Sequence, residues 1–159
     1  MKTKTTLTLL LVAQITLGQS VMEVAEGYIG QSVDKGHCRH FVVQVIKEAG
    51  MTLNKEDTVA VPLPGDVFVT AGIFKVTSTE VWDYYWPQMP PHTAIVTKVL
   101  DDDQYEVIHQ NMGEGVTRDT LDLSLTPDRI TIGIYFVRPT KGEFTREAKR
   151  IISKSKTYL

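Results

Sequence analysis

The chain contains a single cysteine, Cys38, among its 159 residues. One cysteine cannot form an internal disulfide, so the fold must be held together by a hydrophobic core. A chain of this length can bury such a core and falls within the usual size of one domain. The same cysteine is an unmatched thiol, which makes it reactive, intermolecular or incidental to function.

The N-terminal segment has the pattern of a secretory signal. Lys2 and Lys4 give it a positive start, the stretch 7–17 is mostly apolar, and residues 16–18 supply small side chains where a signal peptidase cuts. The apolar stretch is too short to anchor the chain in a bilayer. We therefore expect residues 1–19 to be removed and the mature protein to be secreted or periplasmic. The alternative is a buried N-terminal helix.

Charge and hydropathy exclude some functions. The formal net charge is -2, and a mildly acidic chain without a basic stripe is a poor nucleic-acid binder. No stretch after residue 20 is long and apolar enough to span a membrane. We expect a monomer with its main domain at 20–140 and a basic amphipathic helix or tail at 141–159. The basic face of that helix is either simply solvated or touches an anionic surface.

Two helices are predicted at the start of the mature chain. Apolar residues at helical spacing predict the first over 21–29, ended by Gly30. The second begins at Cys38 and ends at Gly50, with one apolar stripe. That stripe consists of Cys38, Phe41, Val42, Val45, Ile46 and Ala49. Cys38 thus lies in the first turn on the inward face, where the helix dipole favours its thiolate.

The rest of the chain has the pattern of β-strands. We expect strands at 67–69, 92–100, 105–109, 115–121 and 129–137. The second and third of these form a hairpin around Asp101, Asp102 and Asp103. Helices followed by an antiparallel meander are the order of an α+β fold.

A long irregular stretch, 70–91, separates the first two strands. It contains both tryptophans, Trp82 and Trp86, and three prolines. Loops this long inside a compact domain are usually functional or disordered, and the aromatic content argues against disorder. We expect Trp82 and Trp86 to bind substrate; the alternative is a lid that covers the core.

The lone thiol and the histidines supply the parts of a cysteine hydrolase. A thiol attacks an amide only as a thiolate, so a histidine must take its proton and a third polar group must orient that histidine. In the predicted hairpin, opposed residue numbers add up to about 202, which places His92 opposite the region 109–111. His109 and Asn111 share one face of the strand, so either can reach His92. Gln110 points away unless the register slips by one.

Five short motifs stand in order along residues 21–139. They are Cys38-x-x-Phe41-Val42, Pro64-Gly65-Asp66-Val67, His92-Thr93-Ala94-Ile95-Val96, Val107-Ile108-His109-Gln110-Asn111 and Ile134-Tyr135-Phe136-Val137-Arg138-Pro139. In this order they resemble the motifs of the CHAP and NlpC-type cell-wall peptidases and amidases, a papain-like family. The resemblance implies a papain-like α+β fold, with Cys38 as nucleophile and His92 as general base and acid.

The resemblance leaves two positions open. CHAP domains commonly carry an acid where this chain has His109 and an asparagine that matches Asn111, whereas NlpC-type enzymes often use histidine as the third residue. The residue before the cysteine is often glutamine in CHAP and papain-like enzymes and is His37 here. The backbone N–H of Cys38 is one candidate oxyanion donor, and His37 or Gln31 is a candidate for the second.

The sequence therefore predicts an exported cysteine peptidase or amidase that needs no cofactor and cleaves amide bonds, in peptidoglycan peptides by resemblance. The rival interpretation is an inactive wall- or protein-binding domain on the same fold. Cys38 would also suit a buried core position. A zinc site is a further alternative, but His37, Cys38 and His40 lack the paired-ligand spacing of zinc sites, so we expect no metal.

Overall fold

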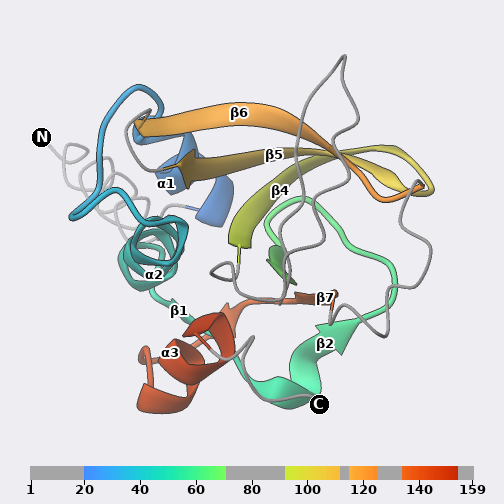
Figure 1. Cartoon of the computed structure of the whole chain (residues 1–159). Helices are drawn as coiled ribbons and strands as arrows, with labels where there is room; N and C mark the ends of the chain where they lie inside the picture. Colours follow the sequence, from blue (N-terminus) through green and yellow to red (C-terminus); the bar gives the residue numbers. More distant parts are fainter. Residues whose placement is uncertain (1–19, 71–91, 112–114, 125–133, 154–159) are drawn as a thin grey trace, which may run out of the picture.

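The computed structural model describes residues 20–70, 92–111, 115–124 and 134–153. In these ranges the chain has an α+β fold, with helices packed on an antiparallel sheet (Figure 1). The predicted signal at 1–19 and the aromatic stretch with Trp82 and Trp86 lie outside the described residues.

Three α-helices are described: α1 (Val21–Gly27), α2 (Cys38–Glu48) and α3 (Arg146–Ser153). α1 begins at a capping box, in which the Ser20 hydroxyl accepts from the N–H of Glu23 and the Glu23 carboxylate accepts from the N–H of Ser20. It ends earlier than the predicted 21–29 because its last turn tightens after Gly27. None of the helices in the described ranges has the length and apolarity needed to cross a membrane.

α2 confirms the predicted second helix. Its inward residues Phe41, Val42, Val45 and Ile46 are fully buried, as the apolar stripe requires. The helix ends before Gly50, whose φ of +65° is the left-handed conformation that closes a helix C-terminus.

The main sheet is antiparallel, with strand order β2-β7-β3-β4-β5-β6. Its strands are β2 (Thr58–Val59), β3 (Val67–Thr70), β4 (His92–Asp101), β5 (Gln104–Asn111), β6 (Gly115–Asp122) and β7 (Tyr135–Val137). A short 3₁₀ helix, Lys55–Asp57, precedes β2. A separate two-stranded sheet pairs β1 (Met51–Thr52) with β8 (Thr140–Lys141).

The β4–β5 hairpin turns at the predicted aspartates. Ile95 pairs with Ile108, so opposed residue numbers add up to 203 at this end, close to the predicted value of about 202. Irregularities nearer the turn change the register there. Continued to the start of β4, this register sets His92 opposite Asn111, with His109 as its diagonal neighbour.

Each face of the sheet carries its own hydrophobic cluster. The cluster against the helices includes Val67, Val69, Ile95, Ile108, Phe41, Val45 and Ile46, together with Ala148, Ile151 and Ile152 of α3. The cluster on the other face includes Phe68, Ala94, Val96, Tyr105, Val107, Leu121 and Phe136. Because side chains alternate along a strand, His92 and His109 belong to the second face, while Thr93 and Gln110 belong to the helix face.

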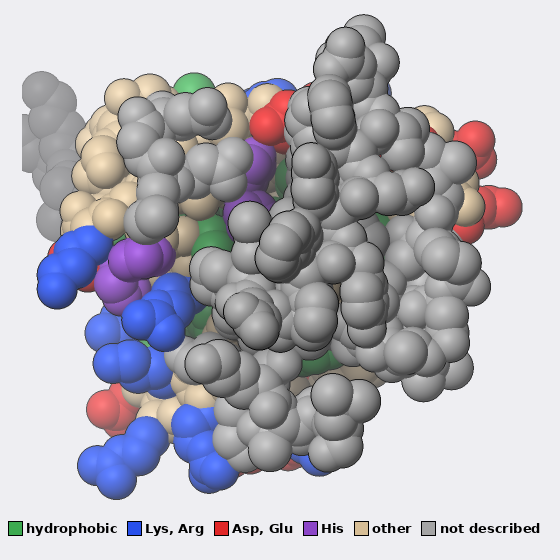
Figure 2. All heavy atoms as spheres, in the orientation of Figure 1, with side chains coloured by type: hydrophobic (Ala, Val, Ile, Leu, Met, Phe, Trp, Pro, Cys, Tyr) green, Lys and Arg blue, Asp and Glu red, His purple; other side chains and the backbone are tan. Residues whose placement is uncertain are grey.

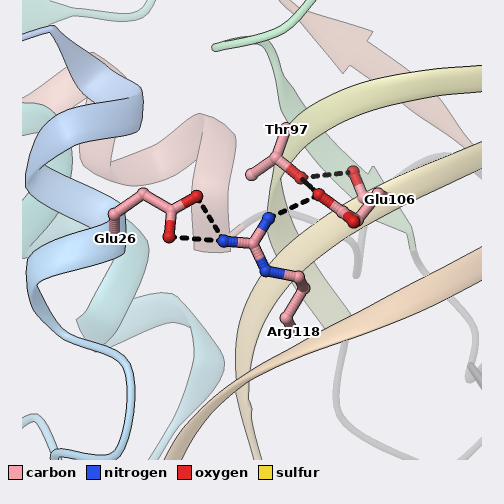
Figure 3. Close-up of polar contacts among 4 residues, drawn as sticks. All are labelled: Glu26, Thr97, Glu106 and Arg118. Atoms are coloured by element: carbon pink, nitrogen blue, oxygen red, sulfur yellow. Dashed lines mark hydrogen bonds and ion pairs between the residues drawn. The ribbon is translucent and has the colours of Figure 1, made fainter.

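A charged clamp holds α1 on the sheet. The guanidinium of Arg118 on β6 bonds both Glu26 of α1 and Glu106 of β5 (Figure 3). The Thr97 hydroxyl donates to the same Glu106 carboxylate at 2.7 Å. α1 and the sheet are thereby tied together immediately before the loop that leads to Cys38.

Candidate active site

Cys38 is the first residue of α2, and main-chain N–H groups surround its sulfur. The N–H groups of Thr93, Arg39 and Cys38 itself hydrogen-bond to the thiol. Thr93 follows His92 on β4, so this contact holds the thiol at the start of the strand that carries His92. The packing of α2 on β4 therefore places Cys38 at the start of the strand that carries His92.

The thiol is nevertheless protonated at neutral pH. Burial raises the pKa of Cys38, although the N–H groups of Thr93 and Arg39 and the positive charge of Arg39 act in the opposite direction. The N–H groups at the start of α2 favour the thiolate, as expected for a helix start, but desolvation of the sulfur outweighs them. Cys38 consequently needs a base to become a nucleophile.

Three side chains from three neighbouring strands form a hydrogen-bonded chain. Nε2 of His92 on β4 lies 3.0 Å from Nδ1 of His109 on β5, and Nε2 of His109 lies 2.9 Å from Oδ2 of Asp119 on β6. The two rings stand edge to face at 76°. His109 is 2% exposed, whereas Asp119 is 34% exposed. The chain thus runs from the partly exposed His92 through the buried His109 to the partly exposed Asp119.

The direction of these hydrogen bonds follows from Asp119. When Asp119 is ionised its carboxylate only accepts, so Nε2 of His109 donates to it; in a His109 ring with no second proton, Nδ1 is then an acceptor. Nε2 of His92 then donates to His109. Nδ1 of His92 is left unprotonated, with its lone pair available to take a proton.

Burial and the neighbouring His109 together lower the pKa of His92 to about 3. His92 is therefore neutral well into the acid range. A neutral imidazole beside a protonated thiol is the protonation state in which a histidine can act as a general base.

Gln110 lies on the opposite face of β5 and anchors the loop before α2. Its Oε1 accepts from the N–H of Val33 at 2.6 Å, and its Nε2 donates to the carbonyl of Val33 at 2.9 Å and to that of His37 at 3.5 Å. Its side chain is almost fully buried. Gln110 points away from His92 as predicted, but its part in fixing where α2 begins was missed.

The two predicted oxyanion residues have other contacts. His37 is the N-cap of α2; its carbonyl accepts from the N–H groups of His40 and Phe41, and its ring stacks edge-on against His40. Gln31 is exposed, and its side-chain amide donates to the carbonyl of Gly27 at 2.7 Å. Gln31 would have to break that bond to donate to an oxyanion.

The Gln31 main chain joins this loop to β6. Its carbonyl accepts from the N–H of Val116 at 2.7 Å. Gly115 allows the approach, because a Cβ at that position would lie 2.8 Å from the Gln31 oxygen and its φ is +77°. Gln31 therefore holds the loop in place.

The remaining predicted site residues are only partly described. Asn111 ends β5, where its main chain pairs with Gly115. Trp82 and Trp86 lie outside the described residues.

Asp119 is the residue that sequence reasoning missed. In the β5–β6 hairpin His109 pairs with Thr117, so Asp119 is its diagonal neighbour on the same face. The signal was an acidic residue at an alternate position of the predicted strand 115–121, which becomes meaningful only when the register of the second hairpin is known.

Within the described ranges, no three or more His, Cys, Asp or Glu side chains are grouped so as to hold a metal ion. No protein-family model, curated protein or solved structure matches this chain. Its function must therefore be inferred from the geometry of the residues themselves.

Proposed function

We propose that this protein is an exported, papain-like cysteine hydrolase that cleaves amide bonds in peptidoglycan peptides. Cys38 is the nucleophile and His92 the general base and acid. The observation that carries the proposal is the continuous chain from His92 through His109 to Asp119, because His92 directly precedes Thr93, whose N–H contacts the Cys38 sulfur. A cysteine that only fills space in the core would need no such chain.

The geometry supports a stepwise reaction. Nδ1 of His92 takes the thiol proton while Sγ of Cys38 attacks the carbonyl carbon, which gives a tetrahedral oxyanion. The main-chain N–H groups of Cys38 and Arg39 point at the sulfur and are therefore close to where that oxyanion forms. The His92 imidazolium then protonates the leaving amine, and a thioester remains on Cys38. Water, deprotonated by the same imidazole, hydrolyses the thioester.

In the proposed mechanism the Asp119 carboxylate offsets part of the cost of placing a charge on His92, whereas burial and the adjoining His109 oppose that charge. When Nδ1 of His92 gains a proton, its Nε2–H still donates to His109, which in turn donates to the Asp119 carboxylate. The negative charge at the end of the chain favours the imidazolium without accepting its proton. This is the part that the third residue plays in a cysteine or serine hydrolase.

Two sequence features support peptidoglycan peptides as the proposed substrate and export as the proposed location. The five ordered motifs resemble cell-wall peptidases and amidases, and the segment 1–19 has the pattern of an export signal. Both are independent of the geometry of the site.

The experiment is digestion of purified peptidoglycan fragments, with the products weighed by mass spectrometry. We expect amide-cleavage products from the native protein and none from Cys38→Ser or His92→Ala. The double variant should be no worse than either single one, since the two residues act as a unit. Near-normal turnover by Cys38→Ser would show that the nucleophile is another residue. Fragment binding without any cleavage would favour the inactive wall-binding domain.

A further inference from the structure

A hollow of about 430 Å³ lies beside the candidate active site, between α2, α3 and the loop before α2. Its lining includes Val33, Asp34, Arg39, His40, Val43 and Lys149. Arg39 directly follows Cys38 in the sequence, and its positive charge acts on the Cys38 thiol.

Two cationic side chains from different helices line this hollow. Arg39 comes from α2 and Lys149 from α3, and both are exposed. Among the described residues neither has a carboxylate within ion-pair distance, whereas Arg118 and Arg138 are both paired. Other described cations, such as Lys98 and Arg150, are also without an ion pair, but Arg39 and Lys149 line the same hollow.

Asp34, the one acid among the described lining residues, neutralises only part of this positive charge. The Asp34 carboxylate lies 2.8 Å from Nδ1 of His40. Burial lowers the pKa of His40, so that ring is neutral at neutral pH and one positive charge remains in excess across Arg39, Lys149 and Asp34. A small anion is the ligand that this balance favours.

The walls that carry the two charges are fixed by packing. Ala148 and Ile152 anchor α3 in the core, and the Tyr135 hydroxyl donates to the Ile151 carbonyl at 3.1 Å. On the other side, Gln110 holds the loop through Val33. The fold thus sets the backbone positions from which the two cations extend.

The hollow and the candidate catalytic residues open on the same side of the molecule. Figure 2 shows the histidine side chains in two groups on one face, with Lys and Arg side chains gathered beside the group at the lower left. The ring contacts pair His37 with His40 and His92 with His109.

We propose that this hollow binds a carboxylate group of the substrate, next to the amide that Cys38 attacks. A guanidinium matches a carboxylate in bidentate geometry, and Lys149 adds a second positive charge. Val33 and Val43 provide an apolar wall for the aliphatic arm that carries the carboxylate. The substrate class is then an acidic peptide with a free carboxylate close to the scissile bond. The link to cleavage rests on the proposed function; the anion site itself does not.

The test uses Cys38 as a reporter and requires no hydrolysis. Iodoacetate and iodoacetamide transfer the same carbon to the thiolate and release iodide, but only the first carries a carboxylate. The ratio of their rate constants cancels the thiolate fraction, and the single cysteine ensures that one site is measured. At physiological ionic strength, charges beyond about 8 Å are screened.

We expect Arg39→Gln to lower the iodoacetate-to-iodoacetamide ratio about five-fold and Lys149→Gln to lower it two-fold or more, on the order of one close charge pair. Arg150→Gln is the matched control, because Arg150 is an exposed cation on the same helix and is not in the lining. An unchanged ratio in the Arg39 and Lys149 variants overturns the proposal. An equal fall in the Arg150 variant also overturns it, since the effect would then come from the general charge of the face.

A second measurement separates this proposal from the proposed function. With peptide substrates that differ only in a carboxylate or its amide, Arg39→Gln should raise KM for the acid and leave KM for the amide unchanged. Equal changes for both peptides overturn the assignment to a substrate carboxylate. If the labelling ratio behaves as expected but no peptide is cleaved, the anion site stands and the hydrolase proposal fails.

Discussion

At the scale of single residues, the site keeps both of its reactive groups uncharged. Burial raises the pKa of the Cys38 thiol and lowers that of His92, so the resting pair is thiol and imidazole rather than thiolate and imidazolium. The reaction must then create the ion pair as it proceeds. In the proposed mechanism, the hydrogen-bonded chain to Asp119 lowers the free-energy cost of forming this ion pair, because it places a negative charge behind the imidazolium.

The pH dependence of turnover follows from His92. Only the neutral imidazole can take the thiol proton, and with a pKa of about 3 His92 remains neutral through the mildly acid range. We expect kcat/KM to stay flat from about pH 5 to 7, where an ordinary histidine with a pKa of about 6.5 would lose activity. A pH–rate profile of the native protein measures this. An acid limb centred near the ordinary histidine pKa would contradict the buried neutral base.

Asp119 is the second residue whose loss should be informative. Asp119→Asn removes the charge that stabilises the imidazolium but leaves His92 and His109 in place. We expect turnover to fall roughly 10- to 100-fold, less than the ~10⁴-fold seen when the group directly bonded to a catalytic histidine is changed. His109→Ala should cost more. Steady-state kinetics check this, with Asp122→Asn on the same strand as the control. Full activity of Asp119→Asn would show that the functional hydrogen-bonded chain stops at His109 and that Asp119 takes no part in it.

At the scale of elements, the start of α2 depends on a side chain from the sheet. Gln110 of β5 bonds both main-chain groups of Val33, as a neighbouring strand would. Both groups of the loop are thereby satisfied, and α2 begins at a fixed height above β4. The position of Cys38 is thus set from two directions, by the loop and by its contact with Thr93.

Gln110→Leu should loosen this loop. The change leaves the N–H and carbonyl of Val33 without partners, at a cost of about 1–3 kcal/mol, and shifts Cys38 relative to His92. Urea denaturation and amide hydrogen exchange at Val33 measure the two effects, and turnover should fall with them. Gln104→Leu on the same strand is the control, because its amide bonds the partly exposed Asp122. Unchanged exchange at Val33 would rule out the anchoring role.

The Arg118 clamp makes a smaller, salt-dependent contribution. Its groups are partly exposed, so Arg118→Met should cost only about 0.5–1 kcal/mol, and less at high salt. The hydrogen bond from Thr97 and the pairing with Arg118 lower the pKa of Glu106. That carboxylate therefore stabilises the fold above its unfolded pKa, and the stabilisation is lost as the pH falls.

Melting curves of Arg118→Met and the native protein, taken across salt and pH, check this contribution. The difference in melting temperature between the variant and the native protein should become smaller both at high salt and at acid pH. Arg138→Met is the comparison, and it should cost more because its partner Asp66 is only 2% exposed. If the difference in melting temperature between Arg118→Met and the native protein does not change with salt, the Arg118 clamp acts through packing and not through charge.

At the scale of the whole molecule, the basic C-terminal segment is part of the core. Ala148, Ile151 and Ile152 of α3 pack in the same cluster as the inward residues of α2. The charged residues of α3 face outward, and one of them, Lys149, lines the hollow beside Cys38. The segment thus contributes to the fold through one face and to the proposed substrate site through the other.

Truncation of a core residue on α3 should therefore destabilise the whole protein. Ile152 is 1% exposed, and Ile152→Ala is expected to cost about 2–5 kcal/mol through lost burial and the cavity left behind. Lys149→Ala on the exposed face is the control and should have almost no effect on stability. Chemical denaturation checks both. If Ile152→Ala melts like the native protein, α3 is only loosely attached.

The parts of this structure that depend on local pattern could be predicted from the sequence, and those that depend on packing could not. The stripe from Cys38 to Ala49 predicted α2, and the aspartates at 101–103 predicted the hairpin that brings His92 and His109 together. Asp119 required the register of a second hairpin. The raised pKa of Cys38 required the burial of its sulfur, a property that no spacing of residues encodes.

The chain from His92 to Asp119 spans three adjacent strands, whereas the nucleophile lies on a helix near the beginning of the chain. During synthesis Cys38 emerges first and Asp119 last. The two histidines and Asp119 can form their hydrogen bonds only when β4, β5 and β6 have paired. A partly synthesised or unfolded chain therefore contains the proposed nucleophile, Cys38, but not the assembled chain of His92, His109 and Asp119 that would ionise it. If Cys38 is the nucleophile that we propose, hydrolysis therefore begins only after the β5–β6 hairpin has formed.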